Sequence, residues 1–158
     1  MMATMHTIRD LVAEHPLLAD LPAGDLDLIA GCGHNVHIPA GRHLFRQGEP
    51  ADVFYLVRSG RVAIEVVAPV GQPLVVSTAG PGSLVGWSWL FPPYRWHLDA
   101  RAVEEVGAIA IDGACLRAKC ESDNGLGYRL MQRFAQLAVD HLQAARLQLL
   151  DLYGDRSG

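Results

Sequence analysis

Short apolar segments separated by glycine turns at regular intervals constrain the fold of this chain more than any other feature. From residue 35 the apolar pattern has a period of two, and turns fall at Ser59-Gly60, Val70-Gly71-Gln72 and Gly80-Pro81-Gly82. The segment LDARAVEEVGAIAID, residues 98–112, adds two more strands. Short strands at this spacing are typical of an antiparallel barrel or jelly roll.

Helical periodicity flanks the predicted strands on both sides. Residues 5–31 are expected to form short helices, residues 113–123 another, and residues 125–154 a long helix that ends at Gly154. The predicted fold class is mainly β, an antiparallel double-stranded β-helix (jelly roll) with flanking helices. We divide the chain into an N-terminal helical segment (1–34), a β-roll (35–112), C-terminal helices (113–154) and a frayed tail (155–158).

The long C-terminal helix carries two apolar stripes. One consists of Leu130, Phe134, Leu137 and His141. The other has heptad spacing, which favours a seam between two copies of the helix and predicts a homodimer. In the alternative, both stripes pack on the chain's own barrel. The residues of the predicted dimer seam are Met131, Ala135, Ala138, Leu142, Ala145, Leu149 and Leu152.

Composition narrows the classes of function. The chain has 158 residues, half of them apolar, which fits one folded domain. A net charge of −4 argues against nucleic acid as a partner. No apolar run approaches the roughly 20 residues that span a bilayer, so we expect a cytoplasmic protein without membrane contact. The cysteines Cys32, Cys115 and Cys120 lack CxxC spacing, and we expect thiols rather than disulfides.

The segment IPAGRHLFRQGEPADVFYLVRSGRVAI, residues 38–64, resembles the cyclic-nucleotide-binding domain family. The resemblance implies an eight-stranded jelly roll, with the long helix in the place of the family's dimerisation helix. In the catabolite activator/Fnr-like transcription regulators of the family, a helix-turn-helix follows that helix. This chain stops at Gly158, so we expect it to lack the DNA-reading element. The matching residues are Gly41, Gln47, Gly48, Glu49, Ala51, Asp52, Tyr55, Val57, Ser59, Gly60 and Val62.

The segment VGWSWLFPPYRWHLDARA, residues 85–102, departs from the family's phosphate-binding cassette. The family uses a glutamate for the ribose 2′-hydroxyl and an arginine for the cyclic phosphate. The resemblance puts Trp87 and Trp96 at those two positions, with Arg95 one residue early. The candidate ligand-binding residues are therefore Gly86, Trp87, Ser88, Trp89, Arg95, Trp96 and His97.

Three interpretations of this segment remain open. Cyclic nucleotides bind with Arg95 or the backbone in place of the lost arginine. Alternatively, the tryptophans fill the old pocket. In the third, a flat or apolar small molecule of unknown identity stacks on indole, with Ser88, Arg95 and His97 as polar anchors.

Other side chains point to no chemistry. His34 and His37 face opposite sides of an extended strand, which disfavours a metal site. Haem ligation through His97 or His141 has no supporting motif, and no catalytic arrangement stands out. We expect no enzyme, no metal and no resident cofactor. The prediction is a homodimeric regulatory or ligand-sensing module that acts on an unidentified protein partner. The alternatives are a relative of transcription regulators that binds cyclic AMP or cyclic GMP, a pocket-plugged scaffold subunit, and a DNA-binding regulator of unusual design.

Overall fold

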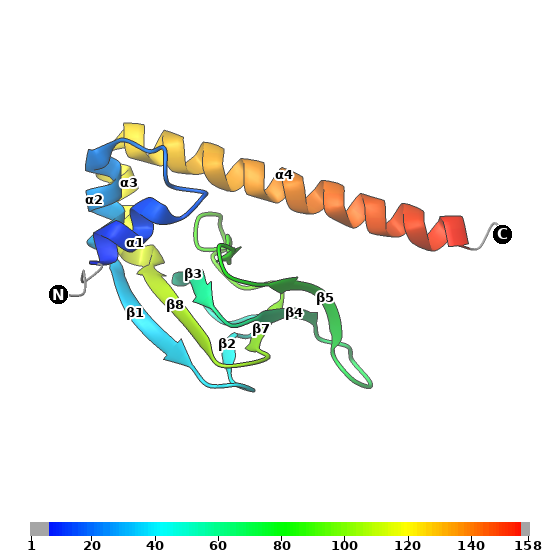
Figure 1. Cartoon of the computed structure of the whole chain (residues 1–158). Coiled ribbons are helices and arrows are strands. Elements are labelled where there is room, and N and C mark those ends of the chain that lie inside the picture. The colour runs from blue at the N-terminus through cyan, green and yellow to red at the C-terminus, as the bar shows by residue number, and fades with distance from the viewer. Residues whose placement is uncertain (1–6, 156–158) are drawn as a thin grey trace.

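Within residues 7–155, eight strands form two four-stranded antiparallel sheets, which confirms the predicted jelly roll (Figure 1). The computed structural model describes residues 7–155, with side chains to residue 152. The first sheet has the order β1 (Gly33–Ile38), β8 (Val106–Asp112), β3 (Val53–Ser59) and β6 (Leu84–Val85). The second has the order β2 (His43–Phe45), β7 (Asp99–Ala102), β4 (Val62–Val66) and β5 (Leu74–Ala79).

The turn between β3 and β4 shows why glycine punctuates the sequence. Gly60 has a φ of +84°, in the left-handed region that side chains disfavour. A Cβ atom at this position would lie 2.1 Å from the carbonyl oxygen of Glu105. Only glycine therefore lets the chain reverse here against the loop that precedes β8.

In the described part of the chain, the roll is flanked by the helices α1 (Ile8–Glu14), α2 (Ala23–Ala30), α3 (Gly113–Ser122) and α4 (Asn124–Asp155). Helix α1 begins at a capping box between Thr7 and Asp10. Strand β1 starts at Gly33, two residues earlier than predicted, because Gly33 pairs with Ile111 on β8. Helix α4 continues one residue past the predicted end at Gly154. Residues 1–6, and residues 156–158 of the predicted tail, lie outside the described part of the chain.

Helix α4 packs on the rest of the chain through its first stripe and through Leu126, which precedes that stripe on the same face. Leu130 and Phe134 are fully buried in a core that includes Phe54 and Trp89. Beyond this contact the helix extends away from the N-terminal helices and above the sheets (Figure 1). Among residues 7–155, no helix combines the length and the apolar character needed to cross a bilayer.

The second stripe of α4 is not covered by the chain's own roll. Its larger members are between 41% and 64% exposed: Met131, Leu142, Leu149 and Leu152. The alternative in which both stripes pack on the barrel is therefore wrong for these four side chains. An exposed leucine row of this length is a surface that another apolar surface stabilises.

The prediction of thiols was wrong for two of the three cysteines. Cys32 and Cys115 form a disulfide, with their Cα atoms 5.9 Å apart, and Cys120 is free. Spacing along the sequence hides this pair, because β1 and β8 bring its two ends together. The Asp112 N–H also donates to the carbonyl of Cys32 at 2.8 Å. The bridge thus joins the end of α2 to the first turn of α3.

Candidate ligand-binding cavity

A cavity of about 1100 Å³ lies between the roll and helix α4. Strands β5 and β6 and the segment 86–98 line it from the roll, residues 15–17 from the N-terminal segment, and residues 137–152 from α4. Its size matches the upper end of small-molecule sites in proteins, roughly 300–1,000 Å³. No Asp, Glu, Lys or Arg occurs among the described residues that line it.

Trp96 belongs to a separate buried cluster with Phe45, Val57 and Ala108, and it lines one wall of the cavity. Its ring stacks on Phe45, with centroids 3.7 Å apart and planes at 8°. Gly86 faces the edge of that ring, and a Cβ at Gly86 would lie 2.6 Å from Cη2 of Trp96. Gly86 also has a φ of +101°. A side chain at position 86 would therefore clash with Trp96 and would also disfavour the backbone conformation of the turn.

Trp89 lies away from the cavity. It is fully buried between Phe54, whose ring centroid is 4.9 Å away, and Phe134 of α4, whose ring meets it edge-on at 5.2 Å. Trp89 therefore joins the roll to α4 and does not line the cavity. The other two tryptophans, Trp87 and Trp96, line the cavity without filling it.

Trp87, Ser88 and His97 line the cavity. The Trp87 ring contacts the His141 ring of α4 edge to face, with centroids 4.9 Å apart. Ser88 is buried and His97 is exposed. The structure thus brings together Gly86, Trp87, Ser88, Trp96 and His97 of the seven candidate residues at the cavity, but not Trp89 or Arg95.

Arg95 does not take the place of the family's arginine. Its Nη1 donates to the carbonyl of Gly48 at 2.8 Å, on the outer side of the segment. The Pro50 and Arg95 backbones also form an isolated β-bridge. The guanidinium of Arg95 therefore links the segment 86–98 to the Gly48 turn.

Arg117 of α3 holds the segment from outside, a role that sequence reasoning missed. It donates to the carbonyls of Trp89 and Ala51 and pairs with Asp52 at 3.1 Å. Its guanidinium also lies over the Tyr94 ring at 4.4 Å from the centroid. No motif marks this arginine, because its partners come from two distant parts of the chain, residues 51–52 and residues 89–94.

His15 is a second cavity residue that sequence reasoning missed. It is 7% exposed and lies in the link between α1 and α2. Its Nδ1 accepts from the Leu17 N–H at 3.2 Å, and its buried Nε2 has no hydrogen-bond partner among the described residues. Burial lowers the pKa of His15 more than the Ser83 backbone, an acceptor beside the ring that falls short of hydrogen-bond geometry, raises it. Near neutral pH the ring is therefore uncharged.

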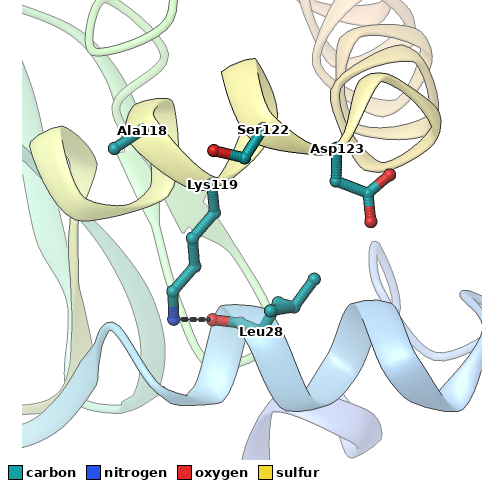
Figure 2. A pocket seen from close by; sticks show the side chains of 5 residues that line it. All are labelled: Leu28, Ala118, Lys119, Ser122 and Asp123. Carbon is teal, nitrogen blue, oxygen red and sulfur yellow. Dashed lines mark hydrogen bonds between the residues drawn. The ribbon is translucent and has the colours of Figure 1, made fainter.

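Other candidate positions show no comparable site. His34 and His37 are exposed on β1, and residues 7–155 hold no group of three side chains able to bind a metal ion. A smaller hollow lies between α2 and α3 (Figure 2). There the Lys119 Nζ donates to the carbonyl of Leu28 at 2.8 Å. This contact satisfies a carbonyl in the last turn of α2 and is structural.

The roll, the cavity and the long terminal helix define the class of β-roll binding domains. The chain belongs to the cyclic nucleotide-binding domain family, whose sequence profile matches residues 35–123. The match begins at the first predicted strand and ends after α3. It confirms the family that the segment 38–64 indicated.

Relatives place the chain beside bacterial regulators. It is 34% identical over 83 residues to a CRP-like cAMP-activated global transcriptional regulator of Mycobacterium tuberculosis, which is 52% of this chain and 37% of that protein. A candidate cyclic nucleotide-binding protein of Geobacter metallireducens GS-15 superposes with a TM-score of 0.77 at 28% identity, over 87% of this chain and 99% of that one. Thermus thermophilus catabolite activator protein gives a TM-score of 0.66 at 28% identity, over 85% and 61%. The chain thus spans little more than a third of the length of the mycobacterial regulator.

Proposed function

We propose that this chain is a non-catalytic regulatory module that senses a small molecule in the cavity and acts as a homodimer through protein contacts. The observation that carries the proposal is the position of α4. Ala145, Leu149 and Leu152 line the cavity and also belong to the predicted dimer seam. A ligand and a partner helix would therefore contact the same side chains, which couples occupancy to assembly.

The dimer part of the proposal is supported by the exposed second stripe. Alternating small and large residues at heptad spacing fit the packing of two parallel helices. Burying this row removes leucine surface from water, at about 25 cal/mol per Å² of apolar area. A second copy of α4 presents the matching surface.

The cassette part is supported by the absence of charged groups along the described cavity wall. A cyclic phosphate there would leave water without a guanidinium to meet it, which is costly. Trp87 offers a ring face or edge where the family places a ribose-binding carboxylate.

The second candidate function is cyclic-nucleotide binding in a relative of transcription regulators. The family membership and the names of the mycobacterial and Thermus relatives favour it. The backbone N–H groups of residues 86–88 would then have to supply the phosphate contact.

The direct test is mass spectrometry of the small molecules released when the purified protein is denatured, with sedimentation equilibrium before and after stripping. We expect one molecule per chain and a dimerisation constant that changes when the molecule is added back. A chain that carries nothing, binds nothing from a metabolite panel and still dimerises would be a scaffold subunit. A released cyclic nucleotide would establish the second candidate.

A further inference from the structure

We propose that the cavity selects an uncharged, largely apolar molecule that presents one hydrogen-bond acceptor, such as a carbonyl oxygen, to Nε2 of His15. The inference rests on the proposed function, because it takes the cavity as the ligand site. It adds the chemical class of the ligand and the residue that orients it.

The first argument is charge. A charged ligand in this cavity would meet no side chain of opposite formal charge among the described lining residues. His97 and His141 are exposed at the rim, where water screens them. An anion or cation of drug size would lose its hydration without replacement, whereas a neutral molecule would not.

The second argument is the character of the walls. The indole of Trp87 lines the cavity together with aliphatic side chains from β4, β5 and α4, among them Ile64, Leu74, Val76, Leu137 and Leu149. Several of these side chains are exposed without a ligand, notably Leu74 on the edge strand β5. An apolar occupant removes its own surface and the cavity wall from water at once.

The third argument is the buried donor of His15. Since Nδ1 accepts from the Leu17 N–H, the proton of the neutral ring is on Nε2. That donor is buried, and the Ser83 backbone beside it falls short of hydrogen-bond geometry; native proteins avoid an incomplete buried donor unless water or a ligand completes it. His15 lines the cavity. The neighbouring lining residues Ser83 and Leu84 carry no carboxylate that could accept its proton.

The experiment uses prodan, a neutral naphthalene dye that carries one ketone, and its ketone-free parent dimethylaminonaphthalene. Binding to the full chain is followed by the blue shift of prodan emission and by calorimetry. We expect saturable binding of one prodan per chain and at least tenfold weaker binding of cyclic AMP. Val76→Trp, which fills the cavity from β5, should weaken prodan at least tenfold. The matched control is Val75→Trp, on the neighbouring β5 residue that does not line the cavity, and it should bind normally.

The role of His15 has its own readout. His15→Phe keeps the ring volume and removes the donor, so prodan should bind about three- to tenfold more weakly, the range of one neutral hydrogen bond. The ketone-free parent should bind His15→Phe and the unaltered chain equally. His15→Gln, which retains an N–H donor, should restore part of the difference and guards against a folding defect in His15→Phe.

Three results would overturn the proposal. Cyclic AMP displaces prodan with a Kd below about 10 μM, both dyes bind Val76→Trp as tightly as the unaltered chain, or His15→Phe weakens the binding of the two dyes equally. A charged molecule released from the denatured protein would also overturn the ligand class, while leaving ligand sensing intact. Loss of the dimer with prodan binding retained would instead count against the proposed function alone.

Discussion

The Trp87 indole meets the His141 imidazole edge to face, with ring centroids 4.9 Å apart and planes at 78°. This pair joins the segment 86–97 to the exposed part of α4, across the cavity wall. Aromatic pairs of this geometry contribute about 0.5–1.5 kcal/mol, and the exposure of His141 places this one at the low end. A double-mutant cycle of Trp87→Ala and His141→Ala in urea unfolding should therefore give a coupling near 0.5 kcal/mol. The control cycle of Trp87→Ala with His97→Ala should be additive, and additivity in both cycles would contradict the contact.

Assembly through α4 gives a second prediction. Ala138→Glu with Leu142→Glu places four carboxylates in the seam of a dimer, and their repulsion should leave a monomer in sedimentation equilibrium. Val139→Glu with Gln143→Glu adds the same charge outside the predicted seam and should leave the dimer intact. A dimer that survives the first pair would place the interface elsewhere.

Cyclic nucleotides give a third prediction. Calorimetric titration with cyclic AMP and cyclic GMP should show a Kd above about 10 μM, weaker than roughly −7 kcal/mol, because no guanidinium lines the described cavity. Restoring the family's glutamate and arginine by Trp87→Glu with Trp96→Arg is not a suitable test for regained binding. Trp96 is stacked on Phe45 in the core, and an arginine there would bury an unpaired charge. Tight binding to the unaltered chain would show that the backbone supplies the phosphate contact.

Arg117 gives a fourth prediction. Arg117→Ala leaves the carbonyls of Trp89 and Ala51 without their donor and removes the cation over Tyr94. Hydrogen bonds to charged groups contribute about 1.5–3 kcal/mol, so urea unfolding should show a loss of about 2–4 kcal/mol. Arg117→Lys should recover little of it, because an ammonium lacks the planar fork. Arg95→Ala, which removes one exposed brace, should cost less than about 1 kcal/mol, and equal losses for Arg95→Ala and Arg117→Ala would contradict this account.

The buried ring of His15 gives a fifth prediction, on pH. Burial lowers its pKa below the ordinary 6.5. Between the lowered pKa and 6.5 the unfolded chain therefore binds more protons than the folded one, and the free energy of unfolding falls as the pH drops through this window. Urea unfolding should show a steeper loss below about pH 6.5 for the unaltered chain than for His15→Phe. Parallel pH profiles would show that His15 is not the group responsible.

Most of the fold could be predicted because it depends on local signals. Glycine turns such as Gly60 recur at strand spacing, and the period changes sharply at Gly113. The site was less predictable. Trp89 follows Trp87 by two residues and Trp96 directly precedes His97. The segment 86–98 is mostly irregular, with Tyr94 at a φ of +57°, so alternation along the chain does not predict which of these side chains face the cavity.

Contacts between distant parts of the chain account for the remaining surprises. His15 reaches the cavity only because the link between α1 and α2 crosses to β6. Arg117 has hydrogen-bond partners that lie 28 to 66 residues away in sequence. Neither residue belongs to a local motif. Their roles follow from the packing of α3 and of the N-terminal segment on the roll.

The Cys32–Cys115 bridge joins residues 83 positions apart, and all eight strands lie between them. The backbone from Cys32 to Cys115 and the disulfide together form a closed covalent loop that contains the whole roll. A protease cut in the exposed turn around Val70 would open the backbone without releasing a fragment. The nicked protein would gain the mass of one water and keep its size on a non-reducing gel, and the two pieces would separate only after a reductant is added.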